Sequence, residues 1–167
     1  ELSVPRIRVV DVHQIILTVK SMISNTGCVT AVRQAFFDQL RGEAIVIFGD
    51  AGCRDLSIIM GYENQLSPAE QQELLLDVSN ILVGACMNGI AEQLGADLGY
   101  SAPSIMAEDI PLDQVLIPEN LSWTHALLVE VNFGLENSDF RSHLLILMTE
   151  EGISSLREAL TQLVESL

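Results

Sequence analysis

Positive charge is scarce in this chain, which has 8 Lys and Arg residues against 23 Asp and Glu residues and a formal net charge of −15. A surface this acidic repels phosphate backbones and anionic lipid headgroups. We therefore expect neither nucleic acid nor a membrane surface as a partner. A partner that presents basic or metal-bound groups is compatible with this charge.

Cysteine and histidine are also few, with three residues of each. No two cysteines form a CxxC pair, and the histidines lack HxxxH or HExxH spacing, so the common zinc motifs are excluded. We expect Cys28, Cys53 and Cys86 to be reduced thiols of a cytoplasmic protein. No apolar run approaches the roughly 18 residues that a membrane span needs. Residues 1–5 lack the features of a signal peptide, so export is not expected.

The length of 167 residues suits one domain, or two half-size repeats that share a core. Helix signals are strongest between Ser67 and Gly95. Ser67 is a good N-cap, Pro68 suits the first helical position, and Glu70 completes a capping box. Gly95 is the expected left-handed terminator. These residues predict a helix of about 27 residues, roughly 40 Å long.

Two shorter helices are expected at residues 51–60 and 150–164, after the N-cap residues Asp50 and Thr149. Alternation of apolar and polar residues, as in residues 30–36, predicts half-buried antiparallel strands. The expected strands are residues 6–12, 29–37, 44–48, 104–110, 126–133 and 144–148.

A Ser-x-Pro-x-Ile pattern occurs around Pro5 and again around Pro103, 98 residues later. Each copy is followed by a long connection, two strands and a helix that begins with an acidic residue. This order predicts one domain over residues 1–167, made of two repeats at about 1–61 and 66–167. The first repeat has no room for a long helix before Pro5. We therefore expect uncovered apolar sheet surface, and either a homodimer or an upstream domain to cover it.

The long helix carries Glu73, Asp77, Asn80 and Gly84 at positions i, i+4, i+7 and i+11, within about 60° of one another. Glycine inside a helix costs about 1 kcal/mol relative to alanine, which suggests that this stripe leaves room for a partner. A polar stripe is also ordinary on an amphipathic helix, so the spacing alone establishes no function. The apolar residues of the far side are Leu75, Leu76, Val78, Leu82, Val83, Met87, Ile90 and Leu94.

With Pro103, which follows Asn80 after 22 residues, this stripe resembles the CheC/CheX/FliY phosphatases of bacterial chemotaxis. Their signature is Asp/Ser-x3-Glu-x2-Asn-x22-Pro, and the resemblance covers nearly the whole chain because they too consist of duplicated halves. It implies an α+β, CheC-like, pseudo-duplicated domain whose mostly antiparallel six-stranded sheet carries long packed helices. The chain departs from the signature twice, with Glu73 in place of Asp or Ser and Asp77 in place of Glu.

The resemblance implies hydrolysis of the aspartyl phosphate on a CheY-like response-regulator receiver domain. Asn80 and Asp77 would be the catalytic residues, Asn80 orienting the attacking water and Asp77 docking the receiver. Glu73 and Gly84 would bind the partner, and Pro103 would be a structural part of the motif. No cofactor or metal of its own is implied, because the receiver brings its own Mg²⁺. Whether an activator protein is also needed is left open.

Two other functions are compatible with the residues. Flagellar switch proteins of the FliM type share this fold and act through protein contacts, so the chain could be a binding module without catalysis. The change at position 77 and the missing first helix favour that alternative. A small-molecule enzyme that uses Glu73 and Asp77 as a carboxylate pair is disfavoured, because an exposed stripe offers no pocket to shift their pKa values.

Overall fold

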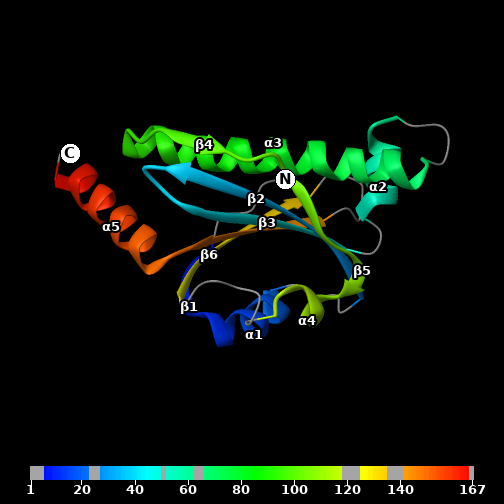
Figure 1. Ribbon diagram of the computed structural model, residues 1–167, viewed down its shortest axis with the longest axis horizontal. Helices are drawn as coiled ribbons and strands as arrows, with labels where there is room; N and C mark the ends of the chain where they lie inside the picture. Colours follow the sequence, from blue (N-terminus) through cyan, green and yellow to red (C-terminus); the bar gives the residue numbers. More distant parts are fainter. Residues whose placement is uncertain are drawn as a thin grey trace.

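The computed structural model describes residues 6–22, 27–49, 52–61, 66–117, 125–134 and 141–165 (Figure 1). All six expected strands and all three expected helices are present, and one short strand (Leu98–Tyr100) and two helices (Val12–Met22 and Leu112–Val115) are additional. The elements are β1 (Arg6–Asp11), α1 (Val12–Met22), β2 (Cys28–Asp38), β3 (Gly42–Gly49), α2 (Gly52–Ile59), α3 (Pro68–Leu94), β4 (Leu98–Tyr100), β5 (Ser104–Pro111), α4 (Leu112–Val115), β6 (His125–Gly134), β7 (Arg141–Met148) and α5 (Glu150–Glu165).

The strands form one sheet in the order β1-β6-β7-β3-β2-β4, and β5 also pairs with β2. Every strand pairing in the described part of the chain is antiparallel, as expected. The sheet therefore has seven strands rather than six, because the three-residue β4 precedes β5 along the same edge. Strands β3 and β7 lie at its centre, β2 and β6 flank them, and β5 and β1 lie outside.

This order gives each strand of the first half a counterpart from the second half at the matching place. An internal duplication produces such an arrangement. The repeat boundaries stay a prediction, and Pro5 lies outside the described residues, as do Asp50 and Ala51 at the start of the second helix.

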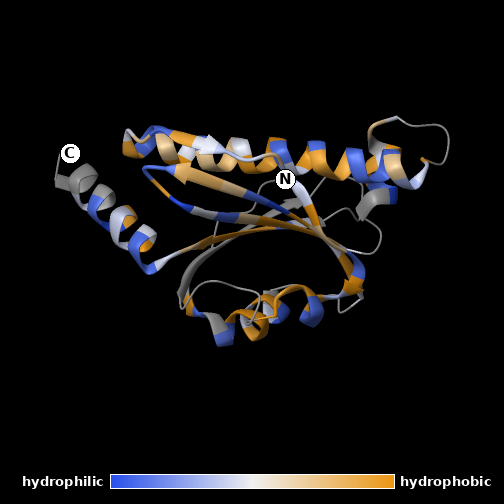
Figure 2. Cartoon of the chain, in the orientation of Figure 1, coloured by the Kyte–Doolittle hydropathy of each residue, from blue (hydrophilic) through white to orange (hydrophobic). Residues whose placement is uncertain are grey.

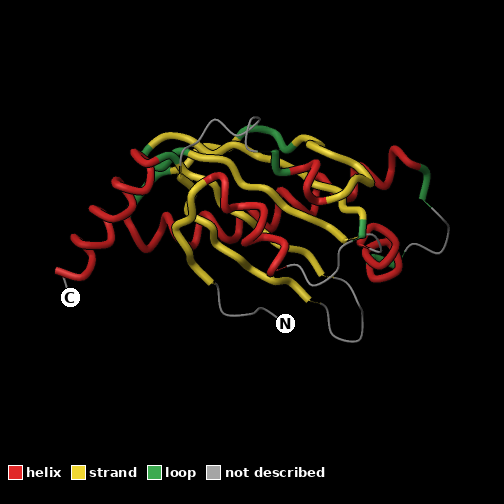
Figure 3. The backbone as a smooth tube through the Cα atoms, turned by 90° about the horizontal axis from the view of Figure 1, so that it is seen from below, coloured by secondary structure: helices red, strands yellow, loops and turns green. Residues whose placement is uncertain are grey.

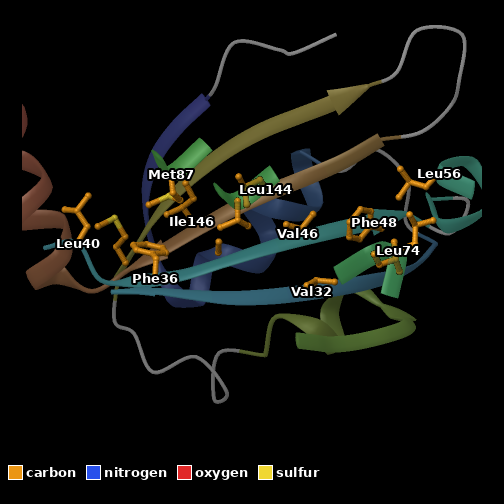
Figure 4. Close-up of a cluster of buried hydrophobic side chains, with 14 of the residues drawn as sticks. Val32, Phe36, Leu40, Val46, Phe48, Leu56, Leu74, Met87, Leu144 and Ile146 are labelled. Carbon is orange, nitrogen blue, oxygen red and sulfur yellow. The ribbon is translucent and has the colours of Figure 1, made fainter. Parts of the chain in front are cut away.

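One face of the sheet packs against α3, α2 and α5. Because side chains alternate along a strand, the even-numbered residues of β2, β3 and β7 point to this face. Figure 4 shows them meeting Leu74 and Met87 from α3. The most buried members from the strands are Val32, Phe36, Ala44, Val46, Phe48, Leu144 and Ile146.

The opposite face packs against α1 and α4, which lie across it (Figures 1 and 3). Helix α1 was not expected, since residues 12–22 are rich in β-branched side chains, which are common in strands. Its Ile15 and Val19, one turn apart, are both 0% exposed. They join a second core cluster with Val29, Ala31, Ile45, Ile47, Leu112, Val115, Leu116, Leu145 and Leu147.

The central strands are therefore buried on both faces. Ile45 and Leu145 on one face and Val46 and Leu144 on the other are each at most 1% exposed. The expectation of uncovered apolar surface is wrong for this central part of the sheet, because α1 and α4 cover one face and α3 the other. The homodimer stays a prediction that needs another reason.

Helix α3 begins and ends where its sequence predicted. The Ser67 hydroxyl accepts a hydrogen bond from the backbone N–H of Glu70, and the Glu70 carboxylate accepts one from the backbone N–H of Ser67 at 2.8 Å. Gly95 follows the helix in the left-handed conformation at φ 60°. Hydrogen bonds from the hydroxyl and the backbone N–H of Ser67 lower the pKa of Glu70.

Helix α3 is also, in the described residues, the one helix long and apolar enough to cross a membrane by length and composition. This corrects the expectation that no segment reaches that threshold. Apolar and polar residues are mixed along α3 (Figure 2), and Ile81 is 67% exposed. In this fold the helix lies along the sheet and buries the residues Leu74, Leu75, Ser79, Val83, Met87 and Ala91.

The Ser67→Ala substitution tests how far the cap stabilises α3. We expect a loss of about 1 kcal/mol in the free energy of unfolding at neutral pH, because an N-cap residue satisfies otherwise unpaired helix N–H groups. The folded-state pKa of Glu70 lies below its ordinary value of 4.5. Its stabilisation is therefore present above that pH and is lost as the pH falls through the folded-state pKa. Urea unfolding at pH 7 and at low pH measures both, and a difference that persists unchanged in acid would contradict the role of Glu70.

Candidate functional site

Four residues of α3 form an exposed line that we call the α3 ridge: Glu73, Asp77, Asn80 and Gly84. The three side chains are exposed and Gly84 is partly buried. The side of the helix that faces the sheet is instead formed by residues four apart, Leu75, Ser79, Val83, Met87 and Ala91. The structure thus brings the predicted residues together on the surface, as their spacing indicated.

The two carboxylates of the ridge have no partner within the described residues. Neither Glu73 nor Asp77 takes part in a hydrogen bond or an ion pair there. Both are therefore available to a basic group of another protein. Their exposure also argues against a carboxylate pair working as acid and base, since water rather than a pocket surrounds them.

Asn80 differs from its acidic neighbours because the sheet holds its side chain. The Nε2 amide of Gln34, on β2, donates to Asn80 Oδ1 at 2.8 Å. The same Nε2 donates to the backbone carbonyl of Ser101 at 2.8 Å. Asn80 is thus exposed yet fixed, which is the state that a group needs if it is to enter a partner's reaction centre.

The segment that carries Ser101 is itself joined to β2. The backbone N–H of Ser101 donates to the carbonyl of Ala35 at 3.0 Å, and the N–H of Ala35 donates to the Ser101 hydroxyl at 3.0 Å. Pro103 follows two residues later, immediately before β5. The 22-residue interval between Asn80 and Pro103 therefore spans the rest of α3 and β4 and returns the chain to the residue that shares Gln34 with Asn80.

This return involves an irregularity in the sheet. Tyr100 pairs with Phe36 and Ser104 pairs with Arg33, so residues 101–103 of one strand oppose residues 34–35 of the other. Such a bulge turns the extra residue out of the ladder, and Pro103, which has no N–H to donate, suits this position. The role of Pro103 in the motif stays a prediction that this geometry makes understandable.

Two further polar contacts hold α3 along the same edge of the sheet. Gln72 donates to both carboxylate oxygens of Glu108 on β5, at 3.1 and 3.0 Å. The hydroxyl of Tyr100 donates to Asn88 Oδ1 at 2.6 Å, and burial raises the pKa of that hydroxyl. Asn80 lies between these two contacts along the helix, so the ridge has a defined position over β2.

The glycine of the ridge has no packing reason within the described chain. A Cβ built on Gly84 would meet no atom within 4 Å, and the same holds for Gly89. Alanine would therefore fit at either position and would be the better helix former. If Gly84 is retained for a reason, that reason lies outside this fold, in something that approaches the helix.

Other chemistries find little support in the described residues. No group of three or more His, Cys, Asp or Glu side chains is placed to hold a metal ion there. Cys86 on α3 is a free cysteine, and burial raises the pKa of its thiol, which disfavours the reactive thiolate. The candidate site consists of exposed side chains on one helix, Glu73, Asp77 and Asn80.

Sequence reasoning missed Gln34 and Ser101. A signal for Gln34 was present, because it occupies an inward position of a strand between Val32 and Phe36 and is 2% exposed. A polar residue among core positions of an alternating strand requires a buried partner. The identity of that partner, 46 residues along the chain, could come only from the fold.

No family sequence model and no curated protein matches this sequence. Solved structures do match it. FliY of Thermotoga maritima is similar with a TM-score of 0.69 and 16% identity, over 97% of this chain and 82% of that one. CheX from Desulfovibrio desulfuricans is similar with a TM-score of 0.53 and 15% identity, over 87% and 84%. The middle domain of FliM from Vibrio alginolyticus has a TM-score of 0.60 and 11% identity, over 95% and 84%.

At these identities the likeness concerns the fold and not the activity. It agrees with the arrangement described above, an antiparallel sheet with α3 along one face and α1 and α4 on the other. The chain has a CheC/CheX/FliY-type α+β fold, which the middle domain of FliM shares.

Proposed function

We propose that this protein is a chemotaxis-type phosphatase that hydrolyses the aspartyl phosphate of a CheY-like receiver domain. The observation that carries the proposal is Asn80, an exposed carboxamide fixed by the sheet and flanked by Asp77 and Gly84 on the α3 ridge. The interval from Asn80 to Pro103 and the fold shared with FliY and CheX support it.

Hydrolysis of an aspartyl phosphate requires few groups from the catalyst. An aspartyl phosphate is an acyl phosphate and already reactive, so the enzyme has to hold a water in line and steady the developing charge. Asn80 offers for this purpose its Nδ2 amide as a donor and the second acceptor site of Oδ1, whose first accepts from Gln34. The Mg²⁺ of the receiver belongs to the substrate and neutralises the phosphoryl oxygens. A protruding ridge suits this reaction, because it can enter the receiver's site where a pocket could not.

Asp77 and Glu73 would dock the receiver through its basic groups. An acidic ridge on a chain of net charge −15 steers such a partner toward it. Asp77 is one methylene shorter than the glutamate of the resembling family, so its partner has to come closer to the helix. The open space beside Gly84 permits that approach.

The second candidate is a binding module without catalysis, in the manner of FliM. The likeness to the FliM middle domain favours it, together with Asp at position 77. The two candidates differ in one measurement. A phosphatase speeds the loss of phosphate from the receiver, whereas a binding module retains the receiver and leaves the rate unchanged or slower.

The Asn80→Ala variant tests the catalytic role. We expect the rate of phosphate loss from a phosphorylated receiver with Mg²⁺ to fall by about 100-fold, because an oriented hydrogen-bonding group is removed from the transition state. Asn88→Ala is the matched control, since Asn88 lies on the same helix and also loses one hydrogen bond. If both variants retain the wild-type rate across the receivers of the host, or the wild type itself gives no acceleration, catalysis is wrong and the binding module is favoured.

Variants of Asp77 test docking. Asp77→Asn should weaken receiver binding by up to about 1 kcal/mol, with a reduced salt dependence, because an exposed ion pair contributes about that much. Asp77→Glu restores the missing methylene and should bind at least as tightly as the wild type. Titration calorimetry at two salt concentrations measures both, with the exposed Glu92→Gln on the same helix as control. Equal binding by wild type and Asp77→Asn would remove Asp77 from the interface.

Gly84→Ala separates stability from docking. It should raise the free energy of unfolding by about 1 kcal/mol, because alanine is the better helix former and nothing obstructs its methyl group. The same methyl group should weaken receiver binding by filling the space that a partner enters. Gly89→Ala should stabilise equally but bind normally, since it lies about 140° around the helix from Gly84. Unchanged binding by Gly84→Ala would mean that Gly84 is not part of the interface, and an equal loss in Gly89→Ala would mean that the effect is not specific to the ridge.

A further inference from the structure

Gln34 is a buried polar residue that packing does not explain. It is 2% exposed on the face of β2 that meets α3, with Val32 and Phe36 on either side at 1% and 2% exposed. Its Oε1 is buried and has no hydrogen-bond partner in the described part of the chain. An unpaired buried carbonyl costs stability that an apolar side chain of similar size would not. The value of Gln34 therefore lies in its amide nitrogen.

The hydrogen bonds of Gln34 have only one consistent direction. The backbone carbonyl of Ser101 can only accept, so the Gln34 atom 2.8 Å from it must be Nε2. That nitrogen has a second hydrogen, which is directed at the carboxamide of Asn80, 2.8 Å away. The atom of Asn80 that receives it must then be the acceptor Oδ1. A carbonyl of the main chain thus determines which way round the exposed carboxamide lies.

The consequence is that Asn80 presents a hydrogen-bond donor on the side away from Gln34. With Oδ1 turned to the sheet, the Nδ2 amide of Asn80 points away from Gln34 and donates to no described residue. Its neighbours on the ridge, Glu73 and Asp77, carry carboxylates that would repel a phosphoryl group. Nδ2 is therefore the ridge group suited to an anionic acceptor.

We propose that Gln34 is a positioning residue, which holds Asn80 so that Nδ2 is presented to an acceptor oxygen of the receiver's phosphoryl site. This rests on the proposed function. Gln34 itself is buried beneath the helix and touches no partner. It should therefore influence the rate of hydrolysis and leave the affinity for the receiver unchanged.

The kinetics of the Gln34→Met variant test whether the rate of hydrolysis changes while the affinity for the receiver does not. The substitution keeps the length of the side chain and removes the amide, so Asn80 is free to rotate. We expect kcat to fall by about tenfold, since small misplacements of a catalytic group are costly, with KM and the measured affinity for the phosphorylated receiver unchanged. Gln72→Met is the matched control, because it also removes a helix-to-sheet hydrogen bond, the one to Glu108. A wild-type kcat for Gln34→Met, or an equal fall for Gln72→Met, would overturn the proposal.

Nuclear magnetic resonance of the wild-type protein tests the orientation without any activity. We expect the Nε2 protons of Gln34 to exchange slowly with water and to show scalar coupling across the hydrogen bond to the Ser101 carbonyl carbon. The Nδ2 protons of Asn80 should exchange rapidly. Slow exchange of the Asn80 amide would mean that Nδ2 faces the sheet, and the proposal would be wrong whatever the kinetics.

The two proposals fail in different ways. If Asn80→Ala does not alter hydrolysis, the phosphatase is wrong, while the resonances still decide the orientation. If Asn80→Ala is inactive and a folded Gln34→Met is fully active, the phosphatase stands and the positioning role of Gln34 is wrong. Should Gln34→Met not fold, the exchange measurement on the wild type still decides the outcome.

Discussion

The hydrogen bond between Gln34 and Asn80 connects the buried sheet to the exposed ridge, and the proposed role of Asn80 depends on it. Without it, Asn80 would be one polar side chain among several on a long helix. With it, a carboxamide on the surface takes its orientation from a backbone carbonyl on the neighbouring segment of the sheet. Burial of one partner and exposure of the other allow rigidity and access at the same site, since a hydrogen bond shielded from water restrains a group more strongly.

A feature of this structure could be predicted from the sequence when the residues that determine it are neighbours in the chain. The ends of α3 could be predicted from neighbouring residues alone, because the capping residues Ser67, Glu70 and Gly95 each lie within one turn of the helix end that they cap. The alternating strands were predicted for the same reason, because each residue's face follows from its neighbours. The α3 ridge also needed only the helical period. Thus the helix, the strands and the line from Glu73 to Gly84 were available from the sequence.

The parts that were missed depend on contacts distant in the chain. Residues 12–22 have the β-branched composition of a strand, and they form α1 because Ile15 and Val19 find a core face across the sheet. Tertiary packing overrides local preference in such cases. The role of Gln34 could not be predicted for the same reason, since its two hydrogen-bond partners lie on a helix and in a bulge that are far from it in sequence. The burial of the central sheet by α1 likewise removed the expected reason for a dimer.

The fold alone cannot separate a phosphatase from an assembly protein, because FliY, CheX and FliM all resemble this chain in structure. The distinction has to come from features that the fold does not require. A binding surface needs complementary shape and charge, and Glu73 and Asp77 would contribute the charge, but it has no need of a carboxamide held in one orientation by a buried residue. Gln34 keeps an unpaired buried oxygen between Val32 and Phe36, while its amide nitrogen donates to Asn80. A cost of this kind is easier to explain by chemistry at Asn80 than by adhesion, and for this reason we favour the phosphatase.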